Sequence, residues 1–354
     1  MSDDILGFGI VGCGVISRWH ANALSEIPEA KLIGVNDVIG ERADALAAEF
    51  GVQSFASLDD MLARDDIHVI CVATPSGLHA EIGIAAAQAG KHVLVEKPID
   101  VTLEMADRLI TACADAGVQL SVISQHRFDD GLQEVRGLID SGRLGRLVVG
   151  TASTKWYRTQ AYYDGADWRG TWKLDGGGSL MNQGVHYVDL LLWLMGPVKS
   201  LVAQANTLAH DIEVEDDAAA LVRFASGAVG TVHASTTMYP GLPERLEICG
   251  TEGSVAIDDG TIVMKELKDE KGETGAYGNR KSSSSEGVSA TTAASDPTAI
   301  KHEGHRRQMV DLISAIKSGT PLLSSGQDGR RALEFIVSVY ESSKTEAPVA
   351  LSGE

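Results

Sequence analysis

Short apolar runs alternate with helix-length segments over the first 125 residues. The runs are rich in β-branched residues and are typical of buried strands, at 5–11, 31–36, 67–73, 91–95 and 118–123. The segments between them are rich in Ala, Leu and Glu and predict helices, as at 40–50, 77–89 and 102–116. Strands and helices that alternate at this spacing predict right-handed crossovers and a doubly wound parallel sheet over residues 1–125.

The pattern changes after residue 125 and predicts a second domain, of α+β type, over 126–354. Helices are expected at 129–141, 178–195, 302–318 and 327–344, and strands at 199–207, 217–225, 228–237, 244–250 and 253–266. The Ala-Ser-Gly sequence at 225–227 favours a hairpin, so this sheet is expected to be open and mostly antiparallel. Residues 268–298 are poor in apolar side chains and predict an exposed, mobile excursion.

The composition argues against several kinds of partner and site. The chain has 354 residues, 44% of them hydrophobic, which suits two folded domains. Its formal net charge of −19 repels phosphate backbones and anionic membranes, so neither nucleic acid nor a membrane is expected as a partner. Four cysteines without a CxxC pair disfavour a disulfide framework and a structural zinc site. With an acidic N-terminus and no long apolar stretch, the chain is expected to be cytoplasmic.

A glycine-rich turn follows the first expected strand and opens a helix. Gly12 permits a tight turn, and Gly14 lets a pyrophosphate approach the backbone where the helix begins at Val15 and Ile16. Asp37 ends the second strand, where a carboxylate accepts hydrogen bonds from both hydroxyls of a ribose. A 2′-phosphate at that place would face the carboxylate, so the pattern favours NAD over NADP.

Two further motifs supply candidate catalytic groups. The tripeptide Glu96-Lys97-Pro98 follows the fifth strand, and ligands of parallel sheets bind beyond the carboxyl ends of the strands, so Lys97 is expected near the nicotinamide. A run of three glycines, 176–178, precedes a helix on which Asn182 and His186 are spaced to share one face. A surface lysine and a core histidine satisfied by its neighbours are the alternative interpretations of these side chains.

The motifs in combination are more specific than any one of them. The Gly-x-Gly turn, the Glu-Lys-Pro tripeptide and the Gly-Gly-Gly…His186…Asp189 helix together resemble the glucose–fructose oxidoreductase, inositol dehydrogenase and MocA (Gfo/Idh/MocA) family over nearly the whole chain. The resemblance implies an N-terminal Rossmann domain and a homo-oligomer, a dimer or tetramer, formed through the C-terminal sheet. The aromatic segment 156–172 looks closest to a sugar-nucleotide branch that includes UDP-N-acetylglucosaminuronate 3-dehydrogenases.

The resemblance also implies a reaction. The chain would be an NAD(H)-dependent oxidoreductase that oxidises a secondary alcohol of a sugar, sugar acid, cyclitol or sugar nucleotide, or reduces the matching ketone. Lys97 and His186 would line the reacting carbon as an acid/base pair, with either one as the base. Asn182 stands where many relatives carry Asp. An amide relays no proton, so Asn182 is expected to donate to a hydroxyl or to hold His186 in one tautomer.

Other side chains are expected around the cofactor and the substrate, because aromatic faces pack on sugar C–H surfaces and an arginine meets a carboxylate or phosphate with two hydrogen bonds. Besides the glycine turn and Asp37, the expected cofactor contacts are Thr74, Pro75, His79, Glu96, Lys97, Gln125, Trp168 and Arg169. The expected substrate contacts are Lys97, Arg158, Tyr163, Trp172, Asn182 and His186.

Three other interpretations fit parts of the sequence. His302, Glu303 and His305 have a spacing that invites a metal, but no third and fourth ligands are evident in the sequence, so no metal is predicted. An NAD-dependent glycosidase would oxidise the sugar only transiently and would release a free sugar without net NADH. A non-catalytic NAD-binding regulator would tend to lack the lysine and the histidine that this chain keeps.

Overall fold

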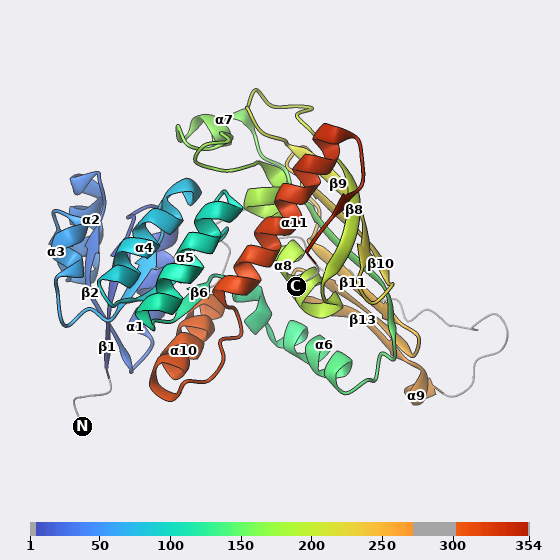
Figure 1. Ribbon diagram of the computed structural model, residues 1–354, viewed down its shortest axis with the longest axis horizontal. Coiled ribbons are helices and arrows are strands. Elements are labelled where there is room, and N and C mark those ends of the chain that lie inside the picture. Colours follow the sequence, from blue (N-terminus) through green and yellow to red (C-terminus); the bar gives the residue numbers. More distant parts are fainter. Residues whose placement is uncertain (1–4, 272–301, 353–354) are drawn as a thin grey trace. The chain divides into compact units, whose positions relative to one another are not determined.

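The computed structural model describes residues 5–271 and 302–352, which divide into two compact units (Figure 1). The first unit contains the described residues up to Phe128, the segment Asp167–Gly177, and the chain from 302 to Glu334. The second unit contains the other described residues. The first change of unit lies close to the predicted boundary at 125/126. The other two segments of the first unit were expected in the second domain.

The first unit is built on a six-stranded parallel sheet with the order β3-β2-β1-β4-β5-β6, so the predicted doubly wound sheet is confirmed. Its strands are β1 (Leu6–Val11), β2 (Ala30–Asn36), β3 (Gln53–Phe55), β4 (Val69–Val72), β5 (His92–Val95) and β6 (Leu120–Val122). Only β3 was not predicted, because Gln53-Ser54-Phe55 contains a single apolar residue. The strand order reverses at β1 and β4, and ligands of such sheets bind beyond the carboxyl ends of the strands at that point.

Helices that flank this sheet come from both ends of the chain. They are α1 (Val15–Ser25), α2 (Gly40–Phe50), α3 (Leu58–Leu62), α4 (His79–Gln88), α5 (Leu103–Ala116) and α10 (Glu303–Ser318), with 3₁₀ turns at Ser76–Leu78 and Gln125–Phe128. Helix α10 buries Met309 and Leu312 in the same core as Phe8 and Ile10 of β1. This packing places α10 in the first unit. Periodicity shows that a helix has an apolar face, but not which core that face covers.

The second unit contains an eight-stranded sheet in the order β13-β12-β11-β7-β10-β9-β8-β14. Its strands are β7 (Leu147–Lys155), β8 (Val198–Asn206), β9 (Asp217–Phe224), β10 (Val229–Ser235), β11 (Arg245–Gly250), β12 (Gly253–Asp258), β13 (Thr261–Leu267) and β14 (Val349–Ala350). All neighbours are antiparallel except β7 and β10, so the mostly antiparallel sheet is confirmed. The expected hairpin at 225–227 joins β9 to β10, and Gly227 has a φ of 88°.

One strand prediction in this sheet was wrong. Residues 253–266 form two strands, β12 and β13, because the chain turns at Asp259 and Gly260, which have φ angles of 45° and 76°. The run Asp258-Asp259-Gly260 is a turn sequence that the apolar residues on either side obscured. Strand β7 was also missed, since it precedes the polar aromatic segment without a clear turn signal.

The helices of the second unit include the one that carries two candidate catalytic groups. They are α6 (Asp130–Asp140), α7 (Gln160–Asp164), a π-helical turn at Ser179–Gly184, α8 (Val185–Met195), the short α9 (Lys268–Lys271) and the last part of α11 (Gly326–Thr345). Helix α8 packs on β7, where Gly150 leaves room for Met195 and Leu191. From residue 272 on, the predicted excursion at 268–298 lies outside the described residues. Within those residues, no helix combines the length and the apolar character that a membrane span requires.

Candidate functional site

The glycine turn after β1 is shaped as an anion-binding site. Gly12 has a φ of 93°, and a Cβ on it would lie 2.5 Å from the carbonyl oxygen of Ala73. Gly14 is exposed, and a Cβ there would meet no atom within 4 Å. Helix α1 begins at Val15 with neither a side-chain cap nor an acidic residue in its first turn. Because the first N–H groups of a helix have no partner within it, this end can take a negatively charged group.

Asp37 is tied to this turn. One carboxylate oxygen accepts the N–H of Cys13 at 2.7 Å, and the other accepts the N–H of Ile39 at 2.8 Å. Each oxygen has a further lone pair, so the carboxylate can also accept hydrogen bonds from ribose hydroxyls. The two predicted parts of a dinucleotide site, the turn and the acidic strand end, are therefore adjacent.

The turns after β4 and β5 are joined by His79. Its ring is buried, with Nε2 2.9 Å from the carbonyl oxygen of Thr74 and Nδ1 2.7 Å from that of Pro98. Burial lowers the pKa of His79, against the two carbonyl groups, which raise it. His79 was expected to contact the cofactor. In the structure it instead fixes Thr74-Pro75 and Lys97-Pro98 relative to each other at the carboxyl edge of the sheet.

Lys97 follows β5 at this edge, and the charges of two carboxylates act on the pKa of its ammonium group. Burial lowers the pKa of the Lys97 ammonium, while the charges of Glu96 and Asp175 raise it. Asp175 is buried and accepts the N–H of Gly170 at 2.9 Å. The Lys97–Pro98 peptide bond is cis. Glu96 belongs to the sequence motif, whereas Asp175 is distant in sequence and approaches Lys97 only in the fold.

Asp175 belongs to the segment 167–177, which is part of the first unit. The N–H of Gly77 donates to the carbonyl oxygen of Leu174 at 2.9 Å, and a Cβ on Gly77 would lie 2.5 Å from the carbonyl oxygen of Lys173. At the other end, Gly176 has a φ of 78° and would place a Cβ 2.5 Å from Val101. Two glycines thus allow this segment to lie close to the turns that surround Lys97.

The same segment carries the predicted aromatic contacts. Trp168 and Arg169 are half-buried, and the guanidinium carbon of Arg169 lies 5.4 Å from the centroid of the Trp168 ring. Trp172 is 47% exposed. Gln125, another predicted contact, is buried, and its Oε1 has no hydrogen-bond partner within the described parts of the chain. These four side chains all belong to the unit that contains the glycine turn.

The second unit holds Asn182 and His186 at the start of one helix. Asn182 lies in the π-helical turn and His186 in the first turn of α8, and both are partly exposed. The turn is anchored at Gly178, on which a Cβ would lie 1.7 Å from the carbonyl oxygen of Glu215. The third glycine of the run is therefore required by backbone packing, as the sequence suggested for the run as a whole. Asp189, the next polar residue of the helix, is buried.

Glu215 holds the start of this turn with its side chain. Its carboxylate accepts the N–H groups of Gly178 and Leu180, both at 2.8 Å, and the hydroxyl of Tyr340 at 3.1 Å. Burial raises the pKa of Glu215 from 4.5 to about 7, although the hydrogen bonds from Leu180 and Gly178 act in the opposite direction. Glu215 was not among the predicted site residues. The acidic run 215–217 before an alternating strand is the signal that would have found it.

This pKa predicts a pH-dependent stability. With a folded pKa above the unfolded one, the folded state holds a proton between about pH 4.5 and 7 that the unfolded state has lost. We expect the free energy of unfolding to fall by up to about 3 kcal/mol as the pH rises through this window, at roughly 1.4 kcal/mol per unit of pKa shift. Glu215→Gln should lack this dependence. Urea unfolding of both proteins from pH 5 to 8 measures it, and parallel curves would contradict it.

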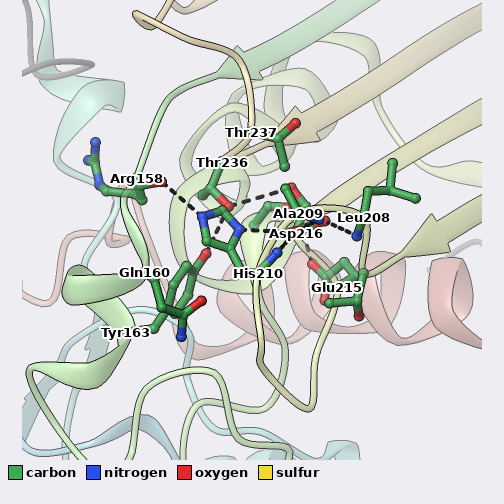
Figure 2. A network of polar contacts seen from close by, with 12 residues as sticks. Arg158, Gln160, Tyr163, Leu208, Ala209, His210, Glu215, Asp216, Thr236 and Thr237 are labelled. Carbon is green, nitrogen blue, oxygen red and sulfur yellow. Dashed lines mark hydrogen bonds and ion pairs between the residues drawn. The ribbon is translucent and has the colours of Figure 1, made fainter.

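Figure 2 shows a polar network beside Glu215, centred on Asp216 and His210, which were not predicted as site residues. Asp216 is fully buried and accepts the N–H groups of Leu208, Ala209 and His210 at 2.7 to 2.9 Å. It also lies 2.9 Å from Nδ1 of His210, whose Nε2 lies 2.9 Å from the carbonyl oxygen of Arg158. The network therefore fixes the backbone at one of the predicted substrate contacts.

Two predicted substrate contacts, Tyr163 and Arg158, are both buried. The hydroxyl of Tyr163 bonds to Oγ1 of Thr236 at 2.8 Å, and its ring lies against His210, so Tyr163 is part of the network. The guanidinium of Arg158 lies 4.7 Å from the Trp156 ring and 5.5 Å from the Tyr162 ring. In Figure 2 it points away from His210. Burial lowers the pKa of Arg158. Arginine on aromatic faces is a common way to present a fixed positive charge.

The His302-Glu303-His305 run does not form one site. His302 lies 2.9 Å from a carboxylate oxygen of Glu26, and Glu303 accepts hydrogen bonds from Arg306 and Arg307. His305 instead faces the interior of the first unit. The spacing suggested a shared ligand set, but the turn of α10 directs the three side chains to different neighbours.

Comparison with known proteins identifies the architecture. A family model described as "Oxidoreductase family, NAD-binding Rossmann fold" matches residues 6–124, and one described as "GFO/IDH/MocA C-terminal domain" matches residues 132–256. The levoglucosan dehydrogenase of Pseudarthrobacter phenanthrenivorans is 30% identical over 72% of this chain and 73% of its own. The inositol 2-dehydrogenase of Rhizobium meliloti is 26% identical over 98% and 99%. The WlbA dehydrogenase of Bordetella pertussis, solved with NADH and UDP-GlcNAcA, is 34% identical, with a TM-score of 0.87 over 99% of both chains.

Proposed function

The chain belongs to the GFO/IDH/MocA family of NAD-binding oxidoreductases, and from this we propose that it transfers hydride between NAD and a secondary alcohol carbon of a UDP-linked sugar acid. The observation that carries the proposal is Lys97, which follows β5 at the sheet edge where the glycine turn and Asp37 form a dinucleotide site. At this edge the charges of two carboxylates act to raise the pKa of Lys97. A lysine ammonium is suited to bind an oxygen on which negative charge develops.

The residues of the first unit fit the cofactor. The open end of α1 suits a pyrophosphate, the fixed Asp37 suits a ribose, and Thr74, Pro75 and Gln125 lie on turns after β4 and β6. NAD, when bound, supplies the hydride acceptor. The chain itself has to bind the alcohol, remove its proton and keep the carbon oriented.

We assign the proton chemistry to Lys97 and His186, as an acid/base pair on the same hydroxyl. A proton leaves the alcohol oxygen as the hydride leaves the carbon, and a base and a cation near that oxygen lower the barrier. Asn182, one turn before His186, would hold the imidazole or a neighbouring hydroxyl. These roles rest on the motifs and on membership of the family.

The substrate class is proposed from the similarity to the Bordetella protein. The chain and the Bordetella protein are similar over 99% of both lengths, and that protein was solved with UDP-GlcNAcA. This chain also holds the buried Arg158 against two aromatic rings, and an arginine suits a carboxylate or phosphate; Trp172 is exposed, which suits a sugar face. We therefore propose a UDP-linked N-acetylated hexuronate as the substrate, oxidised at a ring hydroxyl.

A substrate screen tests this proposal. NADH formation at 340 nm is followed with free sugars, inositols, free uronates, UDP-hexoses and UDP-hexuronates, each with NAD and with NADP. We expect turnover with a UDP-hexuronate and NAD. Turnover with an inositol or a free sugar alone would contradict the substrate class, and NAD binding without turnover of any compound would contradict the enzymatic function.

Asp37 provides a test of the cofactor assignment. A hydrogen bond to a charged group contributes about 1.5–3 kcal/mol, so Asp37→Ala should weaken NADH binding by roughly 10- to 100-fold while NADPH binding changes less. Fluorescence titration of both dinucleotides measures the ratio. Asp44→Ala, at an exposed position in α2, is the control and should leave both affinities unchanged. An unchanged NADH affinity in Asp37→Ala would exclude the ribose contact.

The predicted homo-oligomer has a candidate surface on the second sheet. Val149, Val202, Leu221 and Val229 are 36–57% exposed on β7, β8, β9 and β10. The pairing of Leu221 with Val202, and of Val229 with Val149, places them on one face. Exposed apolar side chains gathered on a sheet face are typical of an interface. We propose that a second copy of the chain covers this face.

A further inference from the structure

A buried histidine fixes the main chain that follows Lys97. His79, the first residue of α4, is 1% exposed. Its Nδ1 lies 2.7 Å from the carbonyl oxygen of Pro98, and its Nε2 lies 2.9 Å from that of Thr74. Because a carbonyl oxygen only accepts hydrogen bonds, each contact is a hydrogen bond only where the ring nitrogen carries a proton.

The number of protons on the ring decides which of the two contacts is a hydrogen bond. Burial lowers the pKa of His79, although the two carbonyl groups and the charges of Glu96 and Asp100 act to raise it. The ring is therefore neutral at pH 7.5 and has one N–H to donate. The shorter contact, with Pro98, favours the tautomer in which Nδ1 carries this proton.

A second buried contact joins the same two segments in the opposite direction. Asp100, two residues after Pro98, is buried, and its Oδ2 accepts the N–H of Ala80 at 3.0 Å. Its Oδ1 accepts the N–H groups of Val101 and Thr102 at 2.7 and 3.2 Å, which fixes the carboxylate. The first N–H groups of a helix have no partner within it, so a carboxylate suits this place. The start of α4 and the turn after β5 are thus joined by side chains from both.

The main chain of Lys97 is also held on the side that precedes its side chain. Oε2 of Glu96 accepts the main-chain N–H of Lys97 at 3.2 Å. Oε1 of Glu96 lies 2.7 Å from Nε2 of His20 in α1 and 3.7 Å from Nε2 of His305 in α10, and these three side chains are buried. The turn that carries Lys97 is therefore fixed both before and after the lysine.

The contact at Pro98 fixes Lys97 as well, because few rotations separate the two residues. The peptide bond between them is planar, and the proline ring locks its own φ. Between the Cα of Lys97 and the carbonyl carbon of Pro98, only the ψ of Lys97 is left to rotate. A shift of the Pro98 carbonyl group therefore moves the Cα from which the lysine side chain extends.

We propose that His79 is a positioning residue for Lys97, which holds the lysine at the substrate oxygen by donating a hydrogen bond from Nδ1 to the carbonyl group of Pro98. The inference deepens the proposed function and rests on it, since Lys97 is the group that acts on that oxygen. His79 acts through the main chain of Pro98 and is not itself a catalytic residue.

Two amide variants separate the two ring contacts. The side-chain nitrogen of asparagine can replace Nδ1 and that of glutamine can replace Nε2, because each pair is separated from Cβ by the same number of bonds. His79→Asn should keep kcat within about threefold of the wild type, whereas His79→Gln should lower kcat by about 10- to 100-fold, since small misplacements of reacting groups have effects of this size. Both variants should bind NADH as the wild type does.

Steady-state kinetics with the substrate found in the screen, together with fluorescence titration of NADH, measure these effects. Equal losses of kcat in the two variants, or a larger loss in His79→Asn, would overturn the proposal. So would a wild-type kcat in His79→Gln, because the bond to Pro98 would then have no effect on the reaction.

His92 is a matched control, because it lies at the other end of β5. Its Nδ1 accepts the N–H of Gln119 at 2.9 Å, so its ring also binds the main chain of a neighbouring segment. His92→Gln should lower the thermal stability and leave kcat nearly unchanged. A loss of kcat as large as that in His79→Gln would show that turnover follows the stability of the strand, which contradicts a positioning role.

The tautomer of His79 can be measured without turnover. In protein labelled with ¹⁵N-histidine, long-range ¹H–¹⁵N correlation spectra distinguish the two ring nitrogens, and the His79 signals are assigned by their loss in His79→Asn. We expect a protonated Nδ1 at pH 7.5. An unprotonated Nδ1 would overturn the proposal even if His79→Gln does not fold, because it cannot donate to Pro98.

Lys97→Ala separates failure of the inference from failure of the proposed function. A large loss of turnover in Lys97→Ala, with equal kcat in the two His79 variants, would refute the positioning role but not the function. Full turnover in Lys97→Ala, with a displaced Lys97 main chain in a crystal structure of His79→Gln, would refute the catalytic role of Lys97 but not its placement by His79.

Discussion

Replacing Lys97 by Ala is expected to lower kcat/KM by about 10³-fold or more. Proton transfer by a positioned group contributes roughly 10²–10⁴, and removal of one donor to a developing oxyanion costs about 10²–10³. NADH affinity should change by no more than about twofold, since the glycine turn and Asp37 stay in place. Steady-state kinetics with the substrate found in the screen, together with fluorescence titration of NADH, measure the two effects separately.

Lys91 is a matched control for this substitution. It precedes the other end of β5, it is buried, and its Nζ donates to the carbonyl oxygen of Arg64 at 2.7 Å. Lys91→Ala removes a lysine next to the same strand, at the edge of the sheet away from the glycine turn. We expect some loss of thermal stability and nearly unchanged kcat/KM. Equal losses of turnover in the two variants would show that Lys97 acts through the fold and not on the substrate.

The substitution Gly178→Ala is expected to destabilise the second unit by about 3 kcal/mol or more. The added Cβ would lie 1.7 Å from the carbonyl oxygen of Glu215, a backbone atom that cannot rotate away. Overpacking of a filled site costs about 1–3 kcal/mol and more where the backbone has to shift. The shift would also displace the π-helical turn that carries Asn182, so turnover should fall together with stability.

Gly137→Ala in α6 is the control for this effect. It belongs to the same unit, and a Cβ there would meet no atom within 4 Å. Since alanine is the better helix former by about 1 kcal/mol, this variant should be as stable as the wild type or slightly more stable. Urea unfolding of both variants gives the comparison. A Gly178→Ala protein with wild-type stability would mean that Glu215 and the glycine run are not in close contact.

The motifs of the candidate site were visible in the sequence because each is local. A glycine turn, a strand-end acid and a lysine after a strand are recognised within about 30 residues, and the parallel sheet then implies which edge they share. Glu215 and Asp216 were missed because their function depends on N–H groups of other segments, such as those of Gly178 and Leu180. An acidic pair before a strand gives no sign of what it binds.

The surroundings of Lys97 show which features of this protein the sequence determined and which only the tertiary structure decided. The sequence by itself determined the alternation of strands and helices, the dinucleotide turn and the lysine after β5, because these follow from periodicity and from the steric needs of single residues. Only the tertiary structure decided that α10 packs on the first unit, and that His20 and His305 reach Glu96 while Asp175 joins it around Lys97. The physical reason is that burial and electrostatic fields depend on which surfaces pack together, and a local pattern does not contain that information.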